Sequence, residues 1–368
     1  GSVHIVDDLI YNMIDNDNKL SSKESLIEKL KDKYPVEEIE EAYEDLLQLV
    51  EEDALYSGDL YEEVAKESDK APSYIKALCL NVVHDCNLRC KYCFADEGEY
   101  KGCRKPMSAD VGKKAIDFVL ANSGGIKNIE VDLFGGEPLM VFDTIKEIID
   151  YGKKRGQEVG KNVRFTMTTN ATLLNDERID YIDKNIGNII LSIDGRKEVN
   201  DAVRIRVDGS GSYDRILPNI KKMVEKRDPS KQYYARGTFT RNNTDFFQDV
   251  MALANEGFTE ISIEPVPDEH ELSLRREDLP TIFGEYDKLY NEMVRRLEEG
   301  DNIFKFYHFN IDLNGGPCVY KRIAGCGAGH EYIAVTPDGE IYPCHQFVGN
   351  TDFLLGNIYD GEIRKDLS

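Results

Sequence analysis

The sequence predicts an α/β fold whose central part is a partial (β/α)6 TIM barrel. Between Tyr74 and about Gly300, short apolar segments alternate with amphipathic ones, which is the pattern of parallel βα units. Six such units are two short of a closed barrel, so we expect an open side wide enough to admit a peptide segment. The predicted strands are 76–83, 128–134, 162–169, 187–193, 233–240 and 259–265. The predicted helices are 107–121, 141–155, 175–184, 212–226, 243–256 and 278–298.

Length and composition fit a chain of two or three domains with a substantial core. The 368 residues are 41% hydrophobic and 31% charged, and the net charge is −23. This charge argues against nucleic acid and against anionic membranes as partners, because both require a basic surface. No apolar run approaches the ~20 residues of a membrane span. No signal peptide is visible, and Gly1-Ser2 looks like the remainder of a tag. Seven of the eight cysteines cluster near two loops, and metal-bound thiolates in a reducing cytoplasm are the simplest explanation.

The segments on either side of the barrel differ from it in character. Residues 1–73 suggest a small winged-helix-like domain ending in a charged linker over 59–73, and 74–305 form the barrel. The expected elements of the first domain are an edge strand at 3–6, helices at 21–31 and from Pro35 to Val50, and a strand at 54–57. Its many glutamates make DNA binding improbable. In residues 306–368 we expect a β-hairpin, with strands at 331–336 and 340–342 and a turn at Pro337-Asp338-Gly339.

Three cysteines follow the first barrel strand at the spacing C-x3-C-x2-C: Cys86, Cys90 and Cys93. A disulfide would leave one thiol over, and nothing in the sequence indicates an oxidising compartment. Zinc would need a fourth ligand such as His84, and structural zinc sites usually contain two C-x-x-C pairs. The third possibility is a [4Fe–4S] cluster, in which three thiolates leave one iron open to another ligand.

Several motifs together resemble the radical S-adenosylmethionine (radical SAM) superfamily. The cysteine motif with Tyr92 is followed by Gly135-Gly136-Glu137-Pro138. The segments RGTFT (236–240), GGPCVYKRIAGCGAG (315–329) and PCHQFVG (343–349) are similar to those of peptide maturases with a SPASM or twitch extension. Within that branch the chain resembles the SCIFF-type or ranthipeptide thioether synthases. The partial barrel is also the fold that this resemblance implies.

The resemblance also implies roles for individual residues. The Cys86, Cys90 and Cys93 thiolates would hold the cluster, and Gly135, Gly136 and Glu137 would bind the methionyl amine of SAM. The alternative interpretation of the Gly135–Pro138 segment is a glycine turn before a helix. The other implied contacts are Tyr92 near adenine, Thr169 and Ser192 at the ribose or carboxylate, Arg204 (with Arg206 as a competitor) at the carboxylate, and Asp194 as a catalytic base or a brace. Core packing is the alternative for Tyr92, and a strand-end cap or a surface ion pair is the alternative for the threonine, the serine and the arginine.

The C-terminal cysteines match an auxiliary-cluster signature. Cys326 and Cys344 enclose the predicted hairpin in the pattern C-x12-G-x4-C, with Gly339 as the glycine, and Cys318 would be a third ligand. A structural zinc with His330 or His345 is the alternative. A full SPASM domain has further cysteines after Cys344. We therefore expect either a piece of a longer chain or a twitch-like site with an open iron, which could bind a substrate thiolate.

These features predict a radical SAM enzyme that uses a 5′-deoxyadenosyl radical to install thioether crosslinks in a cysteine-rich ribosomal precursor peptide. Its cofactors would be the SAM-binding [4Fe–4S] cluster, SAM and at least one auxiliary iron–sulfur cluster. A leader on the peptide would add as a strand to the N-terminal domain, and flavodoxin or ferredoxin would donate electrons. The alternatives are a carbon–carbon crosslink, formylglycine formation, or a zinc-stabilised peptide-binding protein without catalysis.

Overall fold

A computed structural model describes residues 6–14, 19–58, 62, 66, 74–267, 270–311, 321, 325–361 and 364. The chain forms two compact units. The first contains residues 1–72 and 312–326, and the second contains 73–311 and 327–368. The segment 306–368, expected to be one domain, is therefore divided between them. In the described part of the chain, no helix is both long enough and apolar enough to cross a membrane.

The described part of the first unit is helical. The side chain of Asp7 caps the first helix and that of Ser22 caps the second, while Met13, Leu26 and Ile39 are buried between the helices. Both helices expected from the sequence are present, and a short first helix was not predicted. The three helices are α1 (Asp8–Met13), α2 (Lys23–Leu30) and α3 (Val36–Glu51).

The strand predicted at 54–57 is wrong. Asp53 and Tyr56 have φ angles of 58° and 56°, which lie in the left-handed region and interrupt an extended segment. The amides of Ala54 and Leu55 both donate to the carbonyl of Leu49, so this segment closes the end of α3. Val6 is not in a strand, and the rest of the predicted edge strand and most of the predicted linker lie outside the described residues.

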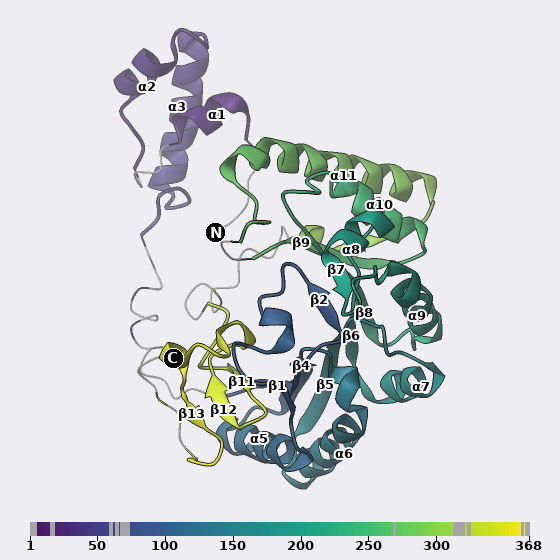
Figure 1. The fold of residues 1–368 in the computed structure, drawn as a ribbon. Coiled ribbons are helices and arrows are strands. Elements are labelled where there is room, and N and C mark those ends of the chain that lie inside the picture. The colour runs from purple at the N-terminus through teal and green to yellow at the C-terminus, as the bar shows by residue number, and fades with distance from the viewer. Residues whose placement is uncertain are drawn as a thin grey trace. The chain divides into compact units, whose positions relative to one another are not determined.

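The second unit is built on a curved parallel sheet with helices on its outer face (Figure 1). The six predicted strands are confirmed and pair in chain order, all parallel. They are β1 (Ala77–His84), β4 (Asn128–Gly135), β5 (Asn162–Thr169), β6 (Asn188–Ser192), β8 (Gln232–Phe239) and β9 (Glu260–Pro265). The helices are confirmed too: α5 (Ala109–Asn122), α6 (Phe142–Glu158), α7 (Asp176–Asn185), α9 (Tyr213–Lys226), α10 (Phe247–Asn255) and α11 (Leu279–Glu299).

Successive residues of a barrel strand face opposite sides of the sheet, and the two sides differ in burial. On β4, Ile129, Val131 and Leu133 are buried against the helices, and the residues between them are partly exposed. The same alternation holds on β5 and β8. The inner face is consequently lined by side chains that retain solvent access, as an open barrel requires.

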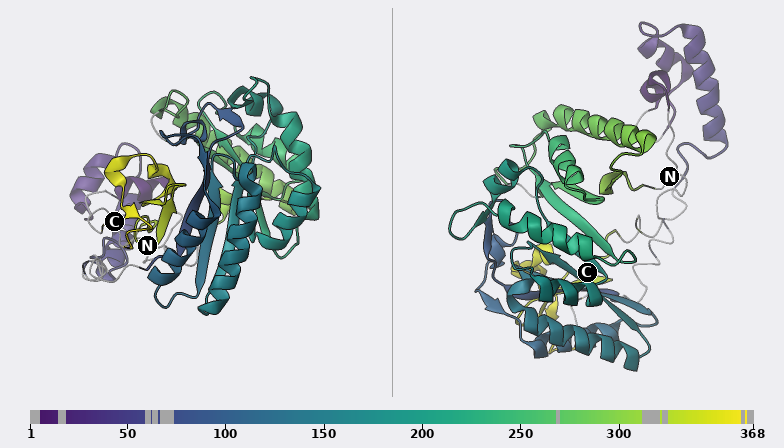
Figure 2. Two further views of the ribbon diagram at one scale, coloured as in Figure 1. Left: turned by 60° about the horizontal axis from the view of Figure 1, so that its bottom comes forward. Right: turned by 90° about the vertical axis from the view of Figure 1, so that its right-hand side faces the viewer.

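Short strands extend the sheet at both edges (Figure 2). The predicted C-terminal hairpin is confirmed, with Gly339 in its turn at φ +81°. Its first strand pairs in parallel with β1 and so continues the barrel sheet. The added strands are β11 (Tyr332–Val335), β12 (Glu340–Tyr342) and β13 (Gly356–Asn357) beyond β1, β10 (Lys305–Phe306) beside β9, and β3 (Lys105–Pro106), which pairs with β1.

A separate two-stranded ribbon was not predicted. In it β2 (Leu88–Cys90) pairs antiparallel with β7 (Arg204–Arg206), so that Cys90 lies opposite Arg204. Helix α8 (Lys197–Val203) leads into β7. Six short 3-10 helices complete the described structure: η1 (Asp96–Gly98), η2 (Pro138–Val141), η3 (Arg276–Asp278), η4 (Tyr307–Phe309), η5 (His345–Phe347) and η6 (Thr351–Phe353).

Candidate active site

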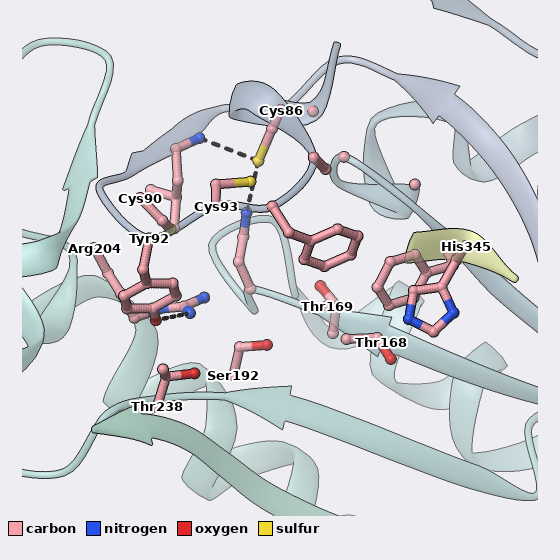
Figure 3. A pocket seen from close by; sticks show the side chains of 18 of the residues that line it. Cys86, Cys90, Tyr92, Cys93, Thr168, Thr169, Ser192, Arg204, Thr238 and His345 are labelled. Carbon is pink, nitrogen blue, oxygen red and sulfur yellow. Dashed lines mark hydrogen bonds between the residues drawn. The ribbon is translucent and has the colours of Figure 1, made fainter. Parts of the chain in front are cut away.

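A cavity of about 420 Å³ lies at the carboxyl ends of the barrel strands (Figure 3). This is the edge where barrel enzymes place their catalytic groups. The cavity brings together nine predicted site residues from segments far apart in the sequence. They are Cys86, Cys90, Tyr92, Cys93, Gly135, Gly136, Thr169, Ser192 and Arg204.

The three cysteines lie on the loop and short strand that follow β1. Cys86 accepts hydrogen bonds from the amide of Leu88 at 3.4 Å and from Nδ2 of Asn170 at 3.7 Å. Burial raises the pKa of the Cys86 thiol to about 12 and that of Cys90 to about 11. Both would therefore stay protonated at neutral pH unless a bound metal supplied positive charge.

This donor set fits an iron–sulfur cluster. In the described part of the chain, no three His, Cys, Asp or Glu side chains surround one point in the way a single metal ion requires. A [4Fe–4S] cluster uses one thiolate for each of several irons, so its ligands need not meet at a point. Cys86, Cys90 and Cys93 all line the cavity and can serve such a cluster.

The glycine pair after β4 lets two backbone segments approach closely. A Cβ atom on Gly135, whose φ is +127°, would lie 2.4 Å from the carbonyl oxygen of Val83. One on Gly136 would lie 1.9 Å from the carbonyl oxygen of Asp85. The amide of Glu137 donates to that same oxygen at 2.9 Å. The glycines thus hold the end of β4 against the cysteine loop.

Glu137 lies behind the cavity wall. Its carboxylate accepts hydrogen bonds from the Thr169 hydroxyl at 2.7 Å, the Asn170 amide at 2.8 Å and the Leu139 amide at 3.0 Å. Burial raises its pKa, and these hydrogen bonds oppose that shift. Glu137 therefore ties the ends of β4 and β5 together, and its predicted contact with the SAM amine stays a prediction.

Tyr92, Asp194 and Arg204 form a buried polar cluster on one side of the cavity. The Tyr92 hydroxyl donates to Oδ2 of Asp194 at 2.6 Å and accepts from Nη1 of Arg204 at 2.9 Å. Asp194 also accepts from the amide of Thr238 at 3.1 Å. Burial raises the pKa of Asp194, and the charge of Arg204 counteracts it. Asp194 is fully buried and does not line the cavity, and its role as a catalytic base or a brace stays a prediction.

Arg204 lines the cavity, and its predicted contact with the SAM carboxylate stays a prediction. It is 7% exposed, and its buried Nε has no hydrogen-bond partner among the described residues. An unpaired buried donor is costly unless a ligand satisfies it. Arg206, the competing candidate, instead pairs with Asp208 at 3.3 Å and does not line this cavity.

The segment after the C-terminal hairpin supplies another part of the lining, on the far side of the cavity from Tyr92 and Arg204 (Figure 3). His345 lies at the start of η5, and its ring centroid is 5.0 Å from that of Phe134. Its Nδ1 atom and the Tyr332 hydroxyl share a hydrogen bond of 2.9 Å. Burial, assisted by the charge of Arg236, lowers the pKa of His345 to about 4. Sequence reasoning assigned no role here to Thr168, Phe134, Arg236 or Thr238, all of which line the cavity. The RGTFT segment that contains two of them was the available signal.

The C-terminal cysteines are only partly located. Cys344 lies in the second unit, directly before His345, and is half-buried. Cys326 is exposed and belongs to the first unit, and Cys318 lies outside the described residues. Their shared role as ligands of an auxiliary cluster stays a prediction.

Comparison with known proteins identifies the family. Residues 80–234 match the radical SAM superfamily, and residues 326–365 match SPASM, an iron–sulfur cluster-binding domain. An uncharacterised protein of Methanocaldococcus jannaschii is 32% identical, with 78% of this chain and 90% of the relative aligned. The cysteine-type anaerobic sulfatase-maturating enzyme of Clostridium novyi is 26% identical over 72% of this chain and 71% of its own length.

Structural similarity supports the same fold. The crystal structure of Streptococcus suis SuiB bound to its precursor peptide SuiA superposes with a TM-score of 0.59 at 18% identity, covering 89% of this chain and 78% of SuiB. The matched domains imply a SAM-binding [4Fe–4S] cluster and auxiliary iron–sulfur chemistry. The chain belongs to the radical SAM superfamily, as an enzyme of the group that modifies peptides or proteins and carries a SPASM extension.

Proposed function

We propose that this enzyme installs thioether crosslinks, from cysteine sulfur to carbon, in a cysteine-rich precursor peptide. One observation carries the proposal. The cavity that contains Cys86, Cys90 and Cys93 is bounded on another side by His345, the neighbour of Cys344. If Cys344 binds the auxiliary cluster, a peptide thiolate held there would share one cavity with SAM.

The two iron–sulfur sites divide the chemistry. When bound, the clusters supply the electron that cleaves SAM to methionine and a 5′-deoxyadenosyl radical, and accept the electron that crosslinking releases. Crosslinking removes two hydrogens from the peptide, one as an atom taken from carbon and one as the thiol proton.

The residues of the chain orient these partners. We propose that Arg204 binds the SAM carboxylate and that Thr169 and Ser192 contact its polar groups from the ends of β5 and β6. Asp194 and Tyr92 hold the Arg204 guanidinium in place from behind. In this proposal Asp194 is a positioning residue, and a contact between Tyr92 and adenine is not required.

The experiment is anaerobic turnover with cysteine-rich precursor peptides, followed by mass spectrometry. Each thioether lowers the peptide mass by two hydrogens and protects one thiol from alkylation. We expect Cys344→Ser to keep peptide-independent SAM cleavage and to lose crosslinking. The matched control is Cys103→Ser, which changes an exposed loop cysteine outside the cavity and should leave both reactions intact. Crosslinking by Cys344→Ser at the wild-type rate would refute the proposal.

Formylglycine formation is the second candidate, because the Clostridium novyi relative is a sulfatase-maturating enzyme. That reaction converts a cysteine side chain to an aldehyde, and the product therefore reacts with hydrazides. A thioether does not react with hydrazides. Testing the same product with a hydrazide separates the two functions.

The partners of the enzyme are proposals of the same kind. A peptide substrate is consistent with the precursor bound to SuiB. We propose that residues 1–73 bind a leader. The described part of that unit consists of the helices α1, α2 and α3, and addition of the leader as a strand stays a prediction. A flavodoxin or ferredoxin is the proposed electron donor.

A further inference from the structure

Arg236 is a charged side chain on the inner face of a central barrel strand. Its neighbours on β8, Ala235 and Gly237, are buried against the helices, so Arg236 points toward the barrel interior. The Arg236 side chain is 48% exposed and lines the cavity. In the parallel register it lies beside Ser192, at the carboxyl end of β6.

One edge of the Arg236 guanidinium is fixed by Glu264. Nε donates to Oε1 of Glu264 at 3.3 Å, and Nη2 donates to Oε2 at 2.7 Å. Glu264 is itself held by the Ser262 hydroxyl at 3.0 Å. Arginine has five N–H donors, and no bond from Nη1 to any described residue is found. Glu264 therefore fixes the plane of the guanidinium and leaves Nη1 available to a ligand.

The charged side chains that line the cavity are both arginines. Arg204 and Arg236 line it, and no aspartate, glutamate or lysine of the described residues does so. Behind this lining, Asp194 lies 3.8 Å from Arg204 and Glu264 pairs with Arg236 at 2.7 Å. SAM has a single carboxylate, which the proposed function gives to the buried Arg204. Arg236 and His345, the neighbour of Cys344, both line this cavity.

We infer that the open edge of Arg236 binds a carboxylate of the substrate peptide, from an aspartate or glutamate at or next to the residue whose carbon is attacked. The guanidinium fork matches a carboxylate in two parallel hydrogen bonds, whereas an amide oxygen can use only part of it. This inference rests on the proposed function and adds a residue that determines its substrate specificity.

The test uses the full-length reconstituted enzyme and a pooled set of synthetic peptides. Each peptide carries the leader of a cysteine-rich precursor, followed by a segment with one cysteine and, a few residues away, one test residue that is Asp, Glu, Asn, Gln or Leu. Mass spectrometry then gives the initial rate of modification of each peptide. We expect the wild-type enzyme to prefer Asp over Asn, or Glu over Gln, by roughly tenfold or more, the range of hydrogen bonds to charged groups.

Arg236→Gln should reduce that preference to within roughly threefold, while SAM affinity and peptide-independent 5′-deoxyadenosine formation stay at wild-type values. Arg236→Lys keeps the charge without the fork and should retain only part of the preference. The control is Arg295→Gln on α11, which removes an arginine of similar exposure that is paired with Glu292 and does not line the cavity. This variant should keep the wild-type acid-to-amide preference, SAM affinity and 5′-deoxyadenosine formation.

Three results would overturn the inference. They are an unchanged acid-to-amide ratio in Arg236→Gln, a loss of SAM affinity in that variant, and a wild-type enzyme that modifies the neutral peptides equally well. If the wild-type enzyme modified the neutral peptides equally well, the proposed crosslinking activity would still be supported. A wild-type enzyme that cleaves SAM and modifies no peptide of the set would count against both the inference and the proposed function.

Discussion

Replacing Gly136 by alanine tests whether the glycine turn positions the cysteine loop. The added Cβ would lie 1.9 Å from the carbonyl oxygen of Asp85, 2.4 Å from its carbonyl carbon and 3.0 Å from the amide nitrogen of Cys86. All three are backbone atoms, so no side-chain rotation relieves the contact. Real Cβ atoms essentially never approach within 3.0 Å, and the loop must therefore move by about 1 Å.

A displacement of this size acts on the residue next to the first cluster ligand. Overpacking costs about 1–3 kcal/mol of stability, and a misplacement of about 1 Å in a catalytic site can cost about a hundredfold in rate. We expect Gly136→Ala to fold, to bind less iron after anaerobic reconstitution and to cleave SAM about a hundredfold more slowly. Iron analysis, chromatographic assay of 5′-deoxyadenosine and thermal unfolding measure the three quantities.

Gly125 provides the matched control. No atom lies within 4 Å of a Cβ built on it, and its backbone is not in the left-handed region. Gly125→Ala should keep the wild-type iron content and rate. If Gly136→Ala also kept both, the close approach between the glycine turn and the cysteine loop would not govern the site.

Three further changes follow from the same contacts. Tyr92→Phe removes a hydroxyl that forms hydrogen bonds with both Asp194 and Arg204. Because losing these bonds costs about 1–2 kcal/mol, the variant should bind SAM roughly tenfold more weakly in equilibrium dialysis. An unchanged Kd for SAM would contradict the role of this cluster. Asp194→Asn should raise the Kd for SAM and change the rate at saturating SAM little. If Asp194 were a general base, the variant would lose rate at saturating SAM and keep the wild-type Kd. Burial lowers the pKa of His308 below its ordinary 6.5, against the charge of Glu264. As the pH falls below 6.5, the unfolded chain therefore binds more protons at this residue than the folded chain does, so acid should lower the free energy of unfolding. In denaturant titrations, His308→Gln should make the free energy of unfolding depend less steeply on pH. An equally steep dependence in the variant would refute this prediction.

The barrel could be predicted because its signals are local and long. The strands β4, β5, β6 and β8 alternate in burial, β1 is a continuous buried run, and the predicted bounds agree with the structure to within a few residues. The cysteine spacing and the Gly135-Gly136 pair fall at strand ends, so their meeting at one edge also followed from the sequence.

Other features depend on contacts that no local pattern encodes. The strands β2 and β7 have three residues each, too few for a period, yet they place Arg204 opposite Cys90. The pairing of β11 with β1 joins segments some 250 residues apart and brings His345 to the cavity. The incorrect strand at 54–57 had suitable apolar residues, but left-handed residues at Asp53 and Tyr56 turn the chain back onto α3.

The most direct test of two iron–sulfur sites around one cavity is iron and sulfide per chain after anaerobic reconstitution. Wild type would be compared with a triple alanine variant of Cys86, Cys90 and Cys93, and 5′-deoxyadenosine would be measured in the same samples. The account predicts about eight irons falling to about four, in units of one [4Fe–4S] cluster, with complete loss of SAM cleavage. Retention of SAM cleavage by the triple variant, or zinc in place of iron in the wild type, would contradict it.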